Sequence, residues 1–218
     1  MNDLWVLKTC CLFAGFTEEK IGEFLKEAGT SVRSYRCLEE IYPFNDVIRE
    51  SGIILSGEVD ITQYNYTGSE GIVSRYRAPA LIGQAFCMTR SVNNVSHFVA
   101  RTSVRLLLLD LRHILSDAHL CARYPQFSRN IILSLAESNI NLNQKIEVLT
   151  QKSLRDKLMM YFSQMKEAHG GTTICLPFNR EQLAQYVCSE RSSVCRELSH
   201  MQSEGLIRLD GNFVTVYS

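Results

Sequence analysis

The sequence predicts an α+β protein with a β-rich N-terminal part, a long helix, and two short C-terminal helices followed by a hairpin. Three observations favour this order. Short apolar runs separated by turn residues fill residues 31–110, apolar residues recur at helical spacing after Pro125, and helix-capping and tight-turn signals crowd residues 179–218. We expect the β-rich part to span 1–120, the long helix and a hinge 121–152, and the C-terminal part 153–218.

The composition excludes several classes of protein. The 23 Lys and Arg residues balance the 23 Asp and Glu residues, so the whole chain lacks the basic field that many nucleic-acid binders carry. No apolar run approaches the ~20 residues that cross a bilayer, and the N-terminus has no secretion signal, so we expect a cytoplasmic protein without a membrane partner. Without a nucleophile–base pair, metal-ligand spacing or phosphate-binding glycine loop, we expect neither an enzyme nor a metal site.

The β-rich part begins with a short helix. Thr17 precedes two glutamates, a pattern typical of a helix start, and Gly29 marks the helix end. The apolar runs that follow are separated by Gly, Asn, Pro and Ser. The clearest runs are 52–55, 59–61, 72–73 and 104–109. Such spacing predicts an antiparallel sandwich or barrel, with residues 106–109 as a buried strand.

The long helix carries an apolar seam. Its residues recur at intervals of three, four and seven, and they are Ile131, Ile132, Leu135, Leu142, Ile146 and Leu149. A long helix with a narrow apolar seam can pair with a second copy as a coiled coil, and packing on the chain's own β part is the alternative. The break near residues 150–152 is the candidate hinge. A second helix is expected from Ser153 to Ala168, before the glycine pair that starts at Gly170.

Two short helices are predicted near the C-terminus. The first opens at Asn179, which forms a capping-box pattern with Gln182. The second follows a turn at residues 188–189 and runs from about Glu190 to Gly205. The residues expected on their buried faces are Leu183, Ala184 and Val187 on the first helix, and Val194, Leu198 and Met201 on the second.

A hairpin follows the second of these helices. Residues 206–209 and 213–217 are its predicted strands, with the tight turn at Asp210-Gly211. Two short helices, a turn and a hairpin are the elements of a winged helix-turn-helix, which binds DNA. Residues 152–218 contain eight basic and seven acidic residues, so we expect affinity to depend on dimerisation and specific contacts rather than on bulk charge.

The outward face of the second short helix carries the side chains expected to contact DNA. At 100° per residue, Ser192 and Arg196 point away from the core, and Arg191 lies in the first turn. Arginine pairs bidentately with O6 and N7 of guanine, and serine adapts to a base or a phosphate. The expected DNA-binding residues are Arg180, Arg191, Ser192, Ser193, Arg196 and Ser199. The alternative is a solvated face on which Glu190 and Glu197 pair with the arginines.

From about Phe16 to Tyr217 the chain resembles the Crp/Fnr family, which includes the cyclic-AMP receptor protein. Residues 176–187 look like the family's first motif helix, 190–198 like its reading helix, 204–207 like the entry to its wing, and 53–59 and 81–83 like parts of its cyclic-nucleotide-binding-like β-roll. The resemblance implies a homodimeric transcription regulator with a β-roll effector domain, a long dimerisation helix and a winged helix-turn-helix. Its implied partner is double-stranded DNA with a two-fold symmetric operator, and RNA polymerase is a further candidate.

The resemblance also implies an effector pocket, lined by Gln84, Asn94, Val95, Leu142 and Asn143. Nucleotide-binding members carry Gly-Glu at the start of the phosphate cassette and Arg-Ser or Arg-Thr at its clasp. This chain has Gln84 after the glycine and Asn94-Val95-Ser96 at the clasp. Because a buried phosphate without its arginine loses a charge-assisted contact, we expect an effector other than cyclic AMP. The identity of that effector, and of any cofactor, is unknown from the sequence.

Two alternatives stay open beside the effector-gated regulator. The β-roll can be a structural or protein-contact module in a regulator that needs no small molecule. The chain can also be a thiol-based redox sensor, for which the candidates are Cys10, Cys11, Cys37 and Cys87. None of the eight cysteines forms a CxxC pair, so an iron–sulfur cluster fits poorly. Ser192 also replaces a glutamate of the family's reading helix, which predicts an altered base preference beside the arginines.

Overall fold

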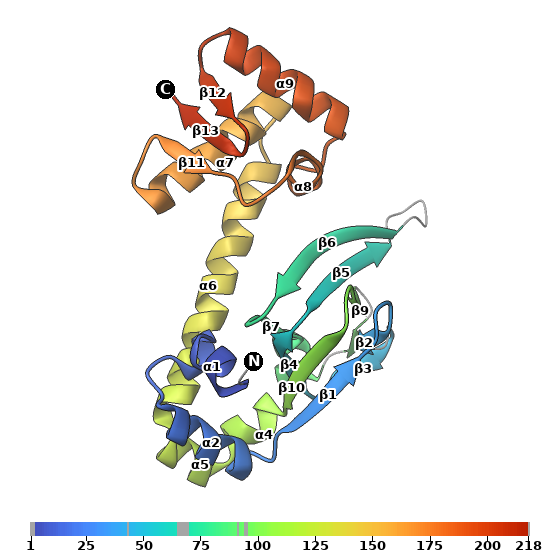
Figure 1. The fold of residues 1–218 in the computed structure, drawn as a ribbon, viewed down its shortest axis with the longest axis vertical. Helices are drawn as coiled ribbons and strands as arrows, with labels where there is room; N and C mark the ends of the chain where they lie inside the picture. The colour runs from blue at the N-terminus through green and yellow to red at the C-terminus, as the bar shows by residue number, and fades with distance from the viewer. Residues whose placement is uncertain (1–2, 43, 65–69, 91, 94–95, 218) are drawn as a thin grey trace. The chain divides into compact units, whose positions relative to one another are not determined.

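The computed structural model describes residues 3–42, 44–64, 70–90, 92–93 and 96–217 (Figure 1). It confirms the predicted α+β class, with antiparallel sheets, a long helix and a C-terminal helical unit. The chain divides into two compact units, Met1–Ala136 and Glu137–Ser218. The division falls inside the long helix α6 (Pro125–Leu149), so the three-part division expected from the sequence stays a prediction.

The first unit is built on two four-stranded antiparallel sheets (Figure 1). One has the order β1-β10-β4-β7, from Ser31–Tyr35, Val104–Leu109, Ser51–Ser56 and Leu81–Ile82. The other has the order β2-β9-β5-β6, from Glu40–Tyr42, His97–Ala100, Glu58–Tyr64 and Glu70–Arg77. A short pair, β3 (Asp46–Val47) and β8 (Val92–Asn93), lies beside them. Each apolar run predicted as a strand falls inside one of these strands.

The turn between β4 and β5 requires glycine. Gly57 has φ +88°, which L side chains rarely adopt, and a Cβ there would clash with the carbonyl of Ser103. Strand β10 continues from this neighbourhood along β4, and all four of its leucines, Leu106–Leu109, are buried. Burial of consecutive residues means that both faces of this sheet are covered, as the continuous apolar run predicts.

The first unit also contains short helices. They are α1 (Asp3–Lys8), a 3₁₀ turn (Cys11–Phe13), α2 (Glu18–Glu27), α3 (Gln84–Thr89), α4 (Leu111–Ser116) and α5 (Ala118–Arg123). Only α2 was predicted, and its cap is as expected, since the Thr17 hydroxyl accepts a hydrogen bond from the Lys20 amide at 3.2 Å. The 3₁₀ turn has three residues and each of the other helices has six, too few to form a helix alone, so tertiary packing of residues such as Leu111 and Ile114 holds them.

The second unit contains the C-terminal half of α6, three further helices and a three-stranded sheet. The helices are α7 (Leu154–His169), α8 (Arg180–Tyr186) and α9 (Arg191–Ser203), and the sheet has the order β11-β13-β12, from Thr173–Cys175, Phe213–Val216 and Ile207–Asp210. Its core includes Val148, Phe162, Leu183, Leu198 and Val214. The break after α6 and the start of α7 at its cap Ser153 confirm the predicted helix boundaries. Among the described residues, no helix combines the length and apolar character that a membrane span needs.

Candidate nucleic-acid interface

The capping box that opens α8 forms as predicted. The Gln182 amide donates to the Asn179 side chain at 2.9 Å, and the Asn179 amide donates to the Gln182 side chain at 3.0 Å. These reciprocal bonds satisfy two amides that a helix start leaves unpaired. Leu183 and Ala184 are buried, so the helix packs into the core of the second unit by the predicted face.

A tight turn joins α8 to α9. Cys188 has φ +53°, a left-handed conformation uncommon outside glycine and asparagine, and the Ser189 amide donates to the Ala184 carbonyl at 2.9 Å. Glu190 is extended and precedes the first turn of α9. The turn therefore joins α8 to α9 through the four residues 187–190.

Helix α9 has one buried face and one exposed face. Val194, Leu198 and Met201 are buried in the core of the second unit. The opposite side is exposed, and its residues are Ser192, Arg196, Ser199 and Ser203. The outward direction inferred from the helical period is therefore confirmed for these four residues. A polar, exposed helix face flanked by a turn and a hairpin has the geometry to enter a major groove.

The arginines of this face are only loosely held. The Arg196 guanidinium donates to the Ser192 carbonyl at 3.3 Å and to the Ser193 hydroxyl at 3.4 Å, both long bonds within the same helix. Arg191 lies 4.0 Å from Glu181 with both side chains exposed. Neither arginine pairs with Glu190 or Glu197, the partners considered from the sequence; Glu181 of α8 is the acid beside Arg191. Such weak exposed contacts leave both guanidinium groups available to DNA.

A third arginine, Arg155, joins α9 to α7 through two glutamates. The Arg155 Nε donates to Glu197 at 2.6 Å, and its two terminal nitrogens donate to Glu204 at 2.7 and 2.8 Å. The hydrogen bonds from Arg155 hold the pKa of the Glu204 carboxyl below its ordinary value. This clamp joins the start of α7 to the middle and end of α9, so it orients the exposed face of α9.

The clamp predicts a pH-dependent contribution to stability. Because the folded pKa of Glu204 is below its ordinary value of 4.5, the contribution is present above pH 4.5 and is lost as the pH falls through the folded pKa. Arg155→Gln is therefore expected to destabilise the chain at neutral pH and to do so less as the pH falls toward about 3. Urea unfolding of both proteins across this range measures the difference. Arg208→Gln, at an exposed position on β12, is the control; parallel wild-type and Arg155→Gln profiles would contradict the account.

The wing is a hairpin with a third strand. Asp210 of β12 pairs with Phe213 of β13, so the two-residue loop is Gly211-Asn212, with Gly211 at φ +57°. The first strand begins one residue later than predicted. The sequence missed β11, which pairs with β13 on its other side, because three residues after two glycines give little periodic signal. Arg180 donates to the Gly211 carbonyl at 3.3 Å, which links the start of α8 to the turn of the wing.

The residues expected to line an effector pocket are not brought together by an observed contact. Gln84 is the first residue of α3 and is half-buried in the first unit. Leu142 and Asn143 are exposed on the part of α6 that belongs to the second unit. Asn94 and Val95 lie outside the described residues. The pocket implied by the resemblance therefore stays a prediction.

The four cysteines considered as redox sensors have different surroundings. Cys10 is buried, and its hydrogen bond with Cys11 together with burial raises the pKa of its thiol, which disfavours the reactive thiolate. Cys87 is also buried and donates to the Arg49 carbonyl at 3.0 Å. Cys11 and Cys37 are exposed. Within the described part of the chain, no three His, Cys, Asp or Glu side chains lie close enough together to hold a metal ion.

Comparison with known proteins identifies the C-terminal unit. Residues 156–217 match the family model of a Crp-like helix-turn-helix domain. The Porphyra purpurea protein ycf28, whose name describes a transcriptional regulator of helix-turn-helix type, is 26% identical over 119 residues, and the match covers 50% of this chain and 50% of that protein. The match thus spans about half the length of this curated relative.

Solved structures share the fold over nearly the whole chain. The catabolite activator protein of Thermus thermophilus has a TM-score of 0.57 at 21% identity, with 95% of this chain and 94% of that chain covered. The c-di-GMP-responsive regulator CLP of Xanthomonas campestris has a TM-score of 0.62 at 19% identity, with 91% and 98% covered. A CooA mutant of Carboxydothermus hydrogenoformans has a TM-score of 0.66 at 19% identity, with 93% and 88% covered. Residues 156–217 are therefore similar to Crp-like helix-turn-helix domains, and the fold of the chain is similar to the folds of these three proteins.

Proposed function

We propose that the chain is a sequence-specific DNA-binding transcription regulator that acts as a homodimer. The observation that carries this proposal is α9, whose apolar side is buried in the domain core while its arginines and serines face outward. The Crp-like helix-turn-helix match over the same residues supports it. In this function α9 enters the major groove and the wing lies beside it.

The contacts divide into base readers and phosphate binders. In this proposal Arg191 and Arg196, both exposed, pair with guanine O6 and N7, and Ser192 and Ser199 lie on the exposed side of α9 with Arg196. Ser193 and Arg180 lie at the edge of this surface, where a hydroxyl or guanidinium meets the phosphate backbone. Guanine is therefore the expected base at the positions that the two arginines read.

The proposed dimer forms through α6. Residues 132, 139 and 146 occupy the a positions of a heptad repeat and residues 135, 142 and 149 the d positions, with isoleucine at two a positions and leucine at every d position. Ile132, Leu142 and Ile146 are 66%, 61% and 56% exposed in the protomer, which is unusual for large aliphatic side chains at the regular spacing of one seam. Isoleucine at a with leucine at d favours a parallel two-stranded coiled coil, so the occupant of this seam is a second copy of the chain.

Asn139 at the central a position predicts a trade between stability and specificity. In a parallel dimer two such asparagines face each other and fix the register and the number of helices, at a cost in stability. Asn139→Ile is expected to stabilise the assembly by about 1.5–3 kcal/mol for each isoleucine buried and to add species larger than a dimer. Sedimentation velocity and thermal unfolding measure both effects. Asn141→Ile, at a c position outside the seam, keeps a single dimer; a single, unstabilised dimer for Asn139→Ile would contradict the heptad assignment.

The signal that gates the regulator is proposed to be a ligand other than cyclic AMP. Gln84 stands where a ribose-binding glutamate is expected, which supports this choice. A regulator without a ligand stays the alternative, and RNA polymerase stays a candidate partner. A thiol-based redox sensor stays a second alternative. The raised pKa of the buried Cys10 disfavours its thiolate, and the buried Cys87 donates its thiol to a carbonyl, whereas Cys11 and Cys37 are exposed.

Enrichment from a pool of random DNA duplexes tests the proposed function. The full chain is expected to recover one sequence motif in two inverted copies, because each protomer of a two-fold dimer reads one half-site. Recovery of sequences at the frequencies of the starting pool would contradict sequence-specific binding. The experiment is repeated with cell extract added, so that DNA binding is also detected if the regulator binds only with its ligand.

A further inference from the structure

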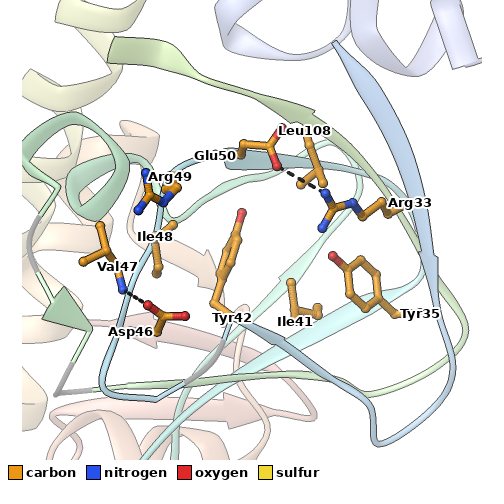
Figure 2. A pocket seen from close by; sticks show the side chains of 10 residues that line it. All are labelled: Arg33, Tyr35, Ile41, Tyr42, Asp46, Val47, Ile48, Arg49, Glu50 and Leu108. Carbon is orange, nitrogen blue, oxygen red and sulfur yellow. Dashed lines mark hydrogen bonds and ion pairs between the residues drawn. The ribbon is translucent and has the colours of Figure 1, made fainter. Parts of the chain in front are cut away.

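A cavity of about 320 Å³ opens in the first unit (Figure 2). Its described walls come from β1, β2, β10 and the segment from β3 to the start of β4. Gln84, Leu142 and Asn143 do not line it. Its volume lies at the lower end of the range of about 300–1,000 Å³ that holds small ligands.

One of the residues that line this pocket is a tyrosine with a buried hydroxyl. Tyr42 is 7% exposed, and its hydroxyl has no hydrogen-bond partner among the described residues. Figure 2 shows this hydroxyl pointing between Arg49 on one side and Arg33 and Glu50 on the other. A buried hydroxyl without a partner costs free energy, and a ligand acceptor removes that cost.

The position of Tyr42 is fixed by two glycines. A Cβ on Gly52 would lie 3.0 Å from the Tyr42 hydroxyl oxygen, and a Cβ on Gly83 would lie 2.9 Å from the edge of the tyrosine ring. On its other side the ring packs edge-on against Phe98, with centroids 5.1 Å apart. A side chain at either glycine would displace the ring, so the backbone of β4 and the end of β7 is shaped around it.

The surroundings keep this hydroxyl protonated. Burial raises the pKa of Tyr42 well above its ordinary value, with further contributions from Tyr35, Cys87 and Glu50 that raise it and from Arg33 that lowers it. Of these residues, Tyr35, Glu50 and Arg33 line the pocket and Cys87 does not. At neutral pH Tyr42 therefore offers a proton to a ligand rather than an anion.

Arg49 provides the charge that is available to a ligand. Arg33 already pairs with Glu50 at 3.6 Å, and the Asp46 carboxylate accepts a hydrogen bond from the Val47 amide at 2.7 Å. Among the described residues, no acid forms an ion pair with Arg49. The backbone carbonyl of Arg49 accepts a hydrogen bond from the Cys87 thiol. A donor hydroxyl and an unpaired guanidinium facing one cavity complement a carboxylate.

The remaining walls of the pocket are apolar. Ile41, Ile48 and Leu108 line it and are buried in the core of the first unit. They complement a hydrocarbon body attached to the carboxylate, and the volume limits that body to one ring or a short chain.

We propose that this pocket binds a small organic acid, whose carboxylate accepts from the Tyr42 hydroxyl and pairs with Arg49 while its apolar body lies on Ile41, Ile48 and Leu108. Two sources share this chemistry: a simple carboxylic acid and an α-amino acid. In the amino acid, Glu50 and Asp46 at the rim are placed to attract the ammonium group.

The test measures binding of phenylacetate and of L-phenylalanine to the full chain by saturation-transfer NMR titration. Tyr42→Phe and Arg49→Gln are each expected to raise the Kd about tenfold or more, since each removes a hydrogen bond to a charged group. Tyr42→Phe should fold normally, because its hydroxyl makes no bond in the protein. The matched controls are Tyr161→Phe, which removes the other buried tyrosine hydroxyl without a described partner, and Arg112→Gln at an exposed position of α4.

Tighter binding of L-phenylalanine than of phenylacetate assigns the site to amino acids, and the reverse order assigns it to simple acids. Either result supports the proposal if Tyr42→Phe weakens binding of the preferred acid. Absence of saturation transfer from both acids to the wild-type protein overturns the proposal, as does a wild-type Kd in Tyr42→Phe. The readout contains no DNA, so its failure is distinguishable from a failure of the proposed DNA-binding function.

Discussion

Leu142→Asp on α6 is expected to convert the proposed dimer into monomers and to weaken DNA binding roughly 10²–10⁴-fold. Leu142 is 61% exposed in the protomer, so the substitution leaves the protomer core intact. In the proposed coiled coil it places two facing carboxylates at a d position, where burial of charge is strongly unfavourable. Each monomer then binds a half-site alone and loses the gain in effective concentration that the second half-site gives. Sedimentation velocity measures the assembly, and fluorescence anisotropy on an enriched duplex measures the affinity.

Ile140→Asp is the matched control for this prediction. Ile140 is 56% exposed on the same helix but occupies a b position, outside the proposed seam. It should remain a dimer with wild-type DNA affinity. A dimeric Leu142→Asp protein, or equal disruption by both substitutions, would show that the exposed apolar residues of α6 do not act as a heptad seam.

Arg196→Ala is expected to remove sequence discrimination while leaving the fold intact. Its guanidinium is exposed and makes only two long hydrogen bonds within α9, so little stability depends on it. A bidentate arginine–guanine pair contributes about 1–3 kcal/mol of discrimination, and a dimer has two, which gives about 2–6 kcal/mol or roughly 30-fold to 10⁴-fold. The measurement is the ratio of Kd values for an enriched duplex and an unrelated duplex of equal length.

Ser203→Ala supplies the control for Arg196. Ser203 is exposed on the same face of α9 but lies at its last residue, away from the turns that enter a groove first. Its ratio of Kd values should equal that of the wild type. If Arg196→Ala weakened binding to both duplexes equally, Arg196 would be a phosphate contact rather than a base reader.

Local signals predicted much of this fold. The Asn179 capping box and the buried residues of α9 each depend on neighbours within a few residues, and each has the predicted form. The hairpin was also predicted, but its two-residue loop is Gly211-Asn212, one residue later than expected. Strand β10 was predictable for the same reason, because its four leucines are consecutive in the sequence and all four are buried. The C-terminal unit was therefore specified by sequence patterns of short range.

Features that depend on distant residues were not predictable. Arg155 is bonded to Glu197 and Glu204, which lie 42 and 49 positions away, and no periodic pattern links them. The pocket around Tyr42 likewise combines β1, β2 and β10 with glycines of β4 and of the segment after β7. The short helices were missed because packing, rather than helix propensity, holds them.

The central claim is that two copies of α9 read guanines in successive major grooves. Methylation interference on an enriched duplex tests it most directly, because methylation at guanine N7 blocks the atom to which a bidentate arginine donates. The account predicts two symmetric clusters of interfering guanines centred about 10–10.5 base pairs apart, both lost with Arg196→Ala. A single cluster, or interference that is unchanged in Arg196→Ala, would contradict it.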